Sequence, residues 1–107
     1  MTKKNIEIRG APDFMKFYKS LATDDKLKEY IDDAIGVLKS NHLAGDQIKN
    51  ELWPKKYVHE HGITNLFRYK LPDAYRMIYT FSGEDRGIIC ILIEVMSHKE
   101  YEKRFGY

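Results

Sequence analysis

The 107-residue sequence predicts one α+β domain, a two-layer sandwich with the element order β-α-α-β-β-β. Two amphipathic helical patterns occupy the first 40 residues, and three segments with strand character fill residues 65–96. No repeat or low-complexity linker divides the chain, and 43% of its residues are hydrophobic. We therefore expect residues 1–107 to form a single domain, with two N-terminal helices packed on one face of a mostly antiparallel sheet.

The first strand and helix follow from short local patterns. Residues 5–9 alternate polar and apolar side chains, which predicts a strand that stops at Gly10. Pro12 suits the first turn of a helix, and apolar side chains recur at helical spacing up to residue 21.

A second, longer helix is expected next. Thr23 is its predicted N-cap, with Asp24 and Asp25 in the first turn, where the helix dipole favours negative charge. Apolar residues then recur along one side as far as Leu38, and Asn41 and Gly45 are expected to bracket the end of the helix.

The stretch "GDQIKNELWPKKYVHEHG" is harder to assign. Because Pro54 disfavours helix at Trp53, we expect a loop or a short helical turn, anchored by Ile48, Leu52 and Trp53. The "HEH" at residues 59–61 has the composition of a metal site, but further ligands at a set spacing are missing, so no metal is expected.

Three strands are predicted at about residues 65–71, 75–81 and 87–96, and the turn "SGEDRG" joins the last two. The near-continuous apolar run at 88–95 marks the third as the central strand. The tail "SHKEYEKRFGY" is expected to form a last turn of helix against the sheet edge. The opposite face of the sheet is then uncovered and available for a ligand.

Three long cations interrupt the apolar alternation of the hairpin "LFRYKLPDAYRMIYTF". Arg68 and Lys70 share one face, whereas the face of Arg76 depends on the length of the loop. A two-residue loop would bury Arg76 unpaired, at a cost of several kcal/mol. A three-residue loop needs a left-handed Ala74, which costs about 1 kcal/mol, and pairs Lys70 with Arg76. We therefore expect the three-residue loop, with all three cations on the uncovered face.

Charge and composition limit the classes of function. The formal net charge is only +2, so nucleic-acid binding would have to come from a local patch, to which Lys55 and Lys56 beside Trp53 are also candidates. The single Cys90 excludes an intramolecular disulfide and indicates a reducing compartment. No segment has the length of a signal peptide core or a membrane span, and no GxGxxG, P-loop, CxxC or Ser-His-Asp signature is present. We expect a cytoplasmic protein without cofactors.

The predicted element order, the hairpin "RYKLPDAYRMIY" and the tail "SHKEYEKRFGY" together resemble the RelE/ParE toxin superfamily, especially its RelE-like mRNA interferase branch. That branch often ends a β-hairpin in Tyr-Arg-hydrophobic-hydrophobic-Tyr. The resemblance implies the toxin of a type II toxin–antitoxin pair that cuts mRNA in the ribosomal A site without a metal ion. The implied partners are a cognate antitoxin, the ribosome and mRNA. The oligomeric state stays open, with a heterotetramer of toxin and antitoxin as one arrangement.

The resemblance also implies site residues. Arg68 and Lys70 match the two basic residues before the turn, and Arg76 matches the arginine of the Tyr-Arg motif. His98, Lys99 and Tyr101 fall where the family places its C-terminal basic and aromatic residues.

Metal-free RNA cleavage by the neighbouring 2′-hydroxyl needs a base, a proton donor for the leaving 5′-oxygen and cations on the phosphorane. Arg76 suits charge stabilisation, because its planar fork bonds two phosphate oxygens. Arg68 is a candidate to hold the flanking backbone, and Tyr101 to stack on a base or donate a proton. Lys70 and His98 are candidates for proton transfer, and which residue is base and which is acid stays open.

Two other functions stay open. A ParE-like inhibitor of DNA gyrase shares the superfamily, but the Tyr-Arg motif and the tail residues His98 and Tyr101 argue against it. A non-catalytic RNA- or protein-binding module on the same fold is supported by the low net charge.

Overall fold

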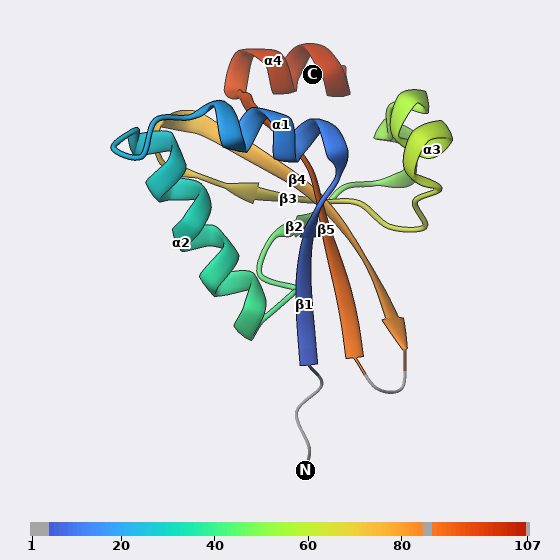
Figure 1. Ribbon diagram of the computed structural model, residues 1–107. Helices are drawn as coiled ribbons and strands as arrows, with labels where there is room; N and C mark the ends of the chain where they lie inside the picture. The colour runs from blue at the N-terminus through green and yellow to red at the C-terminus, as the bar shows by residue number, and fades with distance from the viewer. Residues whose placement is uncertain (1–4, 85–86, 107) are drawn as a thin grey trace.

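The computed structural model describes residues 5–84 and 87–106, and Figure 1 shows how their strands and helices are arranged. The strands are β1 (Asn5–Gly10), β2 (Asp46–Gln47), β3 (Phe67–Lys70), β4 (Tyr75–Glu84) and β5 (Gly87–Ser97). The helices are α1 (Pro12–Ser20), α2 (Lys26–Ser40), α3 (Lys55–His61) and α4 (His98–Phe105), with 3₁₀ turns at Asn50–Leu52 and Pro72–Ala74. The predicted order is present, with a short strand and helix added between α2 and β3 and a longer helix at the C-terminus.

The strands form one sheet in the order β1-β5-β4-β3-β2, in which only β1 and β5 are parallel. The α+β class and the mostly antiparallel sheet are therefore confirmed. β5 is an interior strand, as its apolar run predicts, but β4 is the central one because β2 extends the sheet beyond β3. Residues 82–84 of the predicted turn belong to β4, and its residues Asp85 and Arg86 lie outside the described residues.

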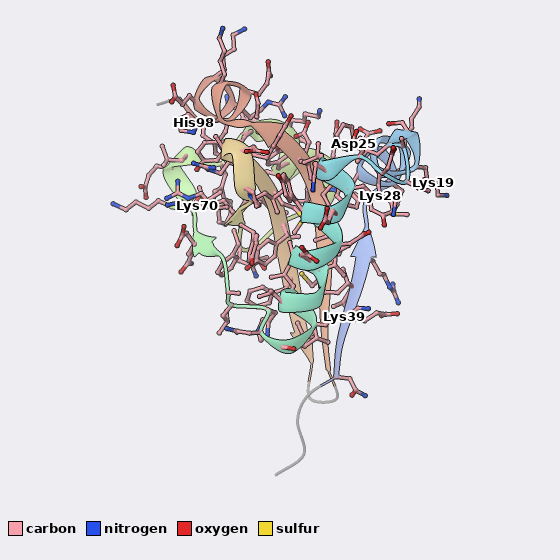
Figure 2. The ribbon with its side chains drawn as sticks, turned by 90° about the vertical axis from the view of Figure 1, so that its left-hand side faces the viewer. Lys19, Asp25, Lys28, Lys39, Lys70 and His98 are labelled. Carbon is pink, nitrogen blue, oxygen red and sulfur yellow. The ribbon has the colours of Figure 1, made fainter. Side chains whose placement is uncertain are left out.

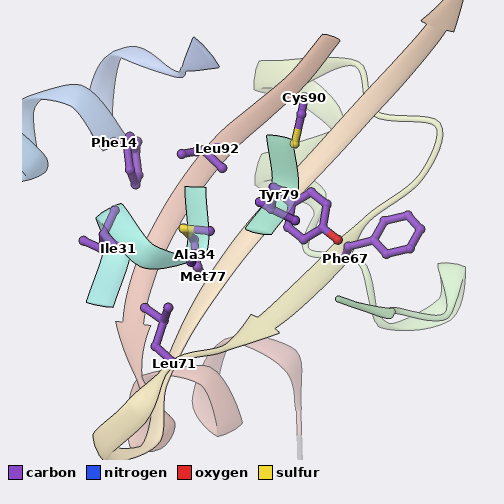
Figure 3. Packing of buried hydrophobic residues seen from close by; sticks show 10 residues of the cluster. Phe14, Ile31, Ala34, Phe67, Leu71, Met77, Tyr79, Cys90 and Leu92 are labelled. Atoms are coloured by element: carbon purple, nitrogen blue, oxygen red, sulfur yellow. The ribbon is translucent and has the colours of Figure 1, made fainter. Parts of the chain in front are cut away.

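The first core lies between this sheet and the helices α1 and α2. Apolar side chains of both helices meet alternate residues of β3 and β4, as strand alternation requires (Figure 3). On β5 they meet Cys90, Leu92 and Val95, because the alternation shifts at the register irregularity opposite Ile78 and Tyr79. Its buried members are Phe14, Ile31, Ala34, Leu38, Phe67, Leu71, Met77, Tyr79, Cys90 and Leu92. The prediction that two N-terminal helices cover one face is confirmed. Cys90 is a buried side chain of this core, and burial raises the pKa of its thiol to about 12.

The start of α2 differs from the prediction. Thr23 is not the N-cap, because it lies in a turn closed by a 3.0 Å hydrogen bond from the Asp25 N–H to the Ala22 carbonyl. Asp25 caps the helix instead, and its Oδ1 accepts from the Leu27 N–H at 2.8 Å. The helix ends at Asn41, the first of the two residues expected to bracket its end, since the Asn41 N–H bonds the Val37 carbonyl and its φ of −153° leaves the helix.

The prediction of a loop or short turn for residues 46–63 missed β2 and α3. Trp53 is extended, as the proline rule predicts, but α3 begins directly after Pro54 and runs for seven residues. Gly62 then ends α3 in the left-handed conformation, at φ 55°. The expected anchoring is present, because Ile48 is buried and Leu52 and Trp53 pack against its neighbours.

A second core covers part of the opposite face, where the sequence suggested an uncovered surface. Tyr57 of α3 and Tyr101 and Phe105 of α4 pack there against Ile78 of β4. The other members are Ile48, Ile63, Leu66, Ile93 and Met96. The tail is therefore a two-turn helix on the face of the sheet, and its expected place at the sheet edge is wrong. Tyr107 lies outside the described residues.

Candidate functional site

The β3–β4 hairpin places the three predicted cations together. Leu71 N–H donates to the Tyr75 carbonyl at 2.9 Å, and Lys70 pairs with Arg76 across the strands. This is the predicted three-residue loop, with Ala74 in the left-handed region at φ 63° and Asp73 there as well, at φ 60°. The predicted register is confirmed, and it directs the cations away from the first core.

Helix α4 brings the C-terminal residues to the same place. It begins immediately after β5, where the Ser97 hydroxyl caps it by accepting from the Glu100 N–H at 3.2 Å. His98, Tyr101 and Glu102 are three or four residues apart, so they share one side of the helix.

These two elements form a pocket of about 290 Å³ on the second face of the sheet. Figure 2 shows Lys70 and His98 on the same side of the molecule, opposite to Lys19, Lys28 and Lys39 of α1 and α2. The pocket is lined by Arg68, Lys70, Arg76, His98, Tyr101 and Glu102, which we call the cationic pocket.

Arg68 forms one wall of the cationic pocket. Its Nη1 donates to the Tyr101 hydroxyl at 2.6 Å, and its guanidinium carbon lies 5.6 Å from the centre of the Tyr101 ring. Asp46 Oδ2 lies 3.5 Å from Arg68 Nε and 4.0 Å from Lys70 Nζ. The pocket and its rim therefore place three cationic side chains, Arg68, Lys70 and Arg76, against the two carboxylates of Asp46 and Glu102, a balance that favours an anion.

A chain of polar contacts crosses the other wall. Arg76 Nη2 lies 3.4 Å from His98 Nδ1, and His98 Nε2 lies 2.5 Å from Glu102 Oε1. Since a guanidinium only donates, Nδ1 is the acceptor in this arrangement and Nε2 carries the proton that Glu102 accepts. Nδ1 is therefore the atom able to take a proton, and the Glu102 carboxylate would stabilise the imidazolium that results.

A second polar network fixes α4, and with it the pocket. Arg104 Nη1 of α4 donates to Glu94 Oε2 of β5 at 2.6 Å, and the Tyr57 hydroxyl of α3 donates to the same oxygen. Burial alone would raise the pKa of Glu94, but the bonds from Tyr57 and Arg104 and the charge of Arg104 outweigh it and lower that pKa. Burial, reinforced by the Glu94 carboxylate, raises the pKa of the Tyr57 hydroxyl. We call these three residues the Glu94 network.

No protein-family model and no curated protein sequence matches this chain. Among solved structures, it is similar to the toxin RelE of E. coli, determined as a double arginine-to-alanine mutant in the free state. The TM-score is 0.56 at 14% identity, and the match covers 95% of this chain and 92% of that chain. The chain has the RelE fold. At 14% identity the similarity establishes the fold alone, and the roles of individual side chains depend on the geometry of the cationic pocket.

Of the predicted site residues, five meet in the cationic pocket of this RelE fold: Arg68, Lys70, Arg76, His98 and Tyr101. Lys55 and Lys56 are exposed on α3 and Lys99 is exposed on α4, and none of them lines the pocket.

Sequence reasoning missed Glu102 and Asp46. The spacing of Glu102 from His98 on a predicted helix was a usable signal, since residues four apart are neighbours. Asp46 gave no such signal, because only the pairing of β2 with β3 brings it to Arg68.

The metal-like motif and the helices of the described residues bear on two further expectations from the sequence. Among the residues that the structure describes, no group of three or more His, Cys, Asp or Glu side chains is arranged to hold a metal ion. Within "HEH", His61 Nε2 lies 3.8 Å from Glu60 Oε2. In residues 5–84 and 87–106, no helix combines the length and apolar character that crossing a membrane requires.

Proposed function

We propose that this protein is the toxin of a type II toxin–antitoxin pair and acts as an mRNA endonuclease on the ribosome. The observation that carries the proposal is the cationic pocket, in which Arg68, Lys70 and Arg76 of one hairpin face His98 and Tyr101 of α4. The RelE fold supports it at the level of the toxin class. In this proposal the protein acts in the cytoplasm, is silenced by a cognate antitoxin, and needs no metal ion.

The chemistry follows from the contacts. The scissile phosphate binds between Lys70 and Arg76, which neutralise the charge that develops on the phosphorane. His98 Nδ1 takes the proton of the 2′-hydroxyl, and Glu102 holds the imidazolium through Nε2. The 2′-oxygen attacks phosphorus and the bond to the 5′-oxygen breaks, leaving a 2′,3′-cyclic phosphate and a 5′-hydroxyl. Lys70 and Tyr101 are the candidates to protonate the leaving oxygen, and Arg68 holds the flanking backbone.

The test is cleavage of a defined mRNA on purified ribosomes, with mapping of the 5′ ends and detection of the cyclic phosphate. Arg76→Ala should lower the cleavage rate at least about 100-fold, because it removes one of the two cations that neutralise the phosphorane. Arg9→Ala is the matched control, since Arg9 is exposed on β1 and pairs only with exposed Glu7 in the described part of the chain.

Three results would contradict the proposal. Equal cleavage by the wild type and Arg76→Ala would remove the pocket from the mechanism. Intact mRNA together with inhibited DNA supercoiling by gyrase would assign the protein to the ParE-like alternative, and ribosome binding without cleavage would assign it to a non-catalytic module.

A further inference from the structure

A second pocket lies beside the segment that the sequence left without a secure assignment. It measures about 560 Å³, within the range of roughly 300–1,000 Å³ that is usual for small-ligand sites. It is lined by Gln47, Ile48, Lys49, Asn50, Trp53 and Thr64, and we call it the Trp53 pocket. None of these residues takes part in the chemistry proposed for the cationic pocket.

The indole of Trp53 is held in a fixed orientation. Its Nε1 donates to the Ile48 carbonyl at 2.9 Å, and its half-buried ring packs against the second core. Ile48 is itself buried and its N–H donates to the Leu66 carbonyl at 2.8 Å. A flat aromatic wall that is already ordered loses little conformational entropy when a planar ligand stacks on it.

Apart from Trp53 and Ile48, the residues that line the Trp53 pocket are polar, and their side chains can bind a ligand. Within the described residues, the side chains of Gln47, Lys49, Asn50 and Thr64 make no hydrogen bond or ion pair with the protein. Two amides and a hydroxyl can donate and accept at the edge of a base, and the ammonium of Lys49 can bind a phosphate. An aromatic plane combined with amide groups and one cation is the set of groups that binds an unstacked nucleotide.

Strand β2 connects the two pockets. Asp46 pairs with Arg68, which lines the cationic pocket, and Ile48, which lines the Trp53 pocket, follows two residues later. Two residues of extended chain span roughly 7 Å, and side chains two residues apart point to the same face. β2 is an edge strand, so a nucleic-acid strand leaving the cationic pocket meets no further strand of the sheet there.

We propose that the Trp53 pocket is an RNA subsite that binds an unpaired base of the strand whose phosphate occupies the cationic pocket. The inference rests on the proposed function for the identity of the ligand. It adds a base-contacting site, and with it a source of sequence or position preference, remote from the cleaved bond.

Trp53 is the single tryptophan of the chain, so its fluorescence reports on this pocket alone. The probe is an adenosine hexanucleotide whose 2′-hydroxyls are all methylated, which prevents cleavage, titrated into the full-length protein. Binding should quench the tryptophan emission. A series of hexamers with one abasic position each should contain one member that binds about 10-fold more weakly and no longer quenches.

Asn50→Ala serves as the variant, because Asn50 is exposed and its loss should not disturb the fold. Asn50→Ala should weaken binding of the complete hexamer several-fold. It should not change the affinity for the one abasic hexamer that already binds weakly and does not quench. Lys26→Ala on α2 is the control and should change neither affinity. Fluorescence anisotropy of a dye-labelled hexamer measures occupancy independently of Trp53.

The two proposals fail separately. A saturated hexamer complex with unchanged Trp53 emission and equal affinities across the abasic series would overturn the subsite, even where mRNA is cleaved. Quenching that depends on one base, in a protein that does not cleave mRNA, would support the subsite and contradict the nuclease.

Discussion

The two faces of the sheet differ in what they bury, although the same strands supply both. The first core is apolar, and its buried hydroxyl, that of Tyr79, is satisfied by donating to the His42 carbonyl and accepting from the Gly45 N–H. The second face combines a smaller apolar core with the Glu94 network and the cationic pocket. Because side chains alternate along a strand, adjacent residues of β4 serve different purposes: Arg76 lines the pocket and Met77 is buried in the first core. Side chains that build the first core and side chains that line the cationic pocket thereby alternate along one strand.

The largest effect is expected from the first core. Met77→Ala should lower the free energy of unfolding by about 3 kcal/mol, because it removes a fully buried side chain and leaves a cavity. Its neighbour Arg76→Ala should change that free energy by about 0.5 kcal/mol or less. Urea denaturation measures both. A similar loss of stability in the two variants would show that the faces are not separated.

The next largest effect should come from the Glu94 network. Glu94→Gln should lower the free energy of unfolding by about 2 kcal/mol, since it weakens a charge-assisted bond and leaves Arg104 without a matching carboxylate. Glu7→Gln is the control, because its ion pair with Arg9 is exposed, and it should cost less than about 0.5 kcal/mol. Equal effects in urea denaturation would remove the network from the stability of α4.

The same network predicts a dependence on pH. The folded-state pKa of Glu94 lies below its unfolded value, so its contribution is present above the unfolded pKa and is lost as the pH falls through the folded pKa. The stability difference between wild type and Glu94→Gln should therefore be full at about pH 7 and shrink towards about pH 3. Denaturation curves over this range measure it, and a difference that grows on acidification would contradict the direction of the shift.

The smallest effect concerns the hairpin that orients the cations. Ala74→Gly should raise the free energy of unfolding by up to about 1 kcal/mol, because glycine adopts the left-handed conformation that Ala74 holds under strain. Ala44 is exposed and has no positive φ, so Ala44→Gly should instead lower stability slightly. A loss of stability in Ala74→Gly would argue against the three-residue loop.

The sequence by itself determined the helices of the first core, the hairpin register and the shared face of Arg68, Lys70 and Arg76. These features depend on periodicity within one element, and on a choice between two loops whose energetic costs differ by several kcal/mol. The tertiary structure decided how the second face is covered. Helix α3 is too short for its periodicity to be recognised beside Pro54, and the burial of α4 depends on Ile78 and Ile93 of other elements.

The tertiary structure likewise decided which residues surround the cationic pocket and the Trp53 pocket. Asp46 reaches Arg68 through a two-residue strand, and the Trp53 pocket closes only where Thr64 meets the stretch from Gln47 to Trp53. Local propensity carries no information about such contacts, because their energy comes from groups that are distant along the chain and meet only after folding.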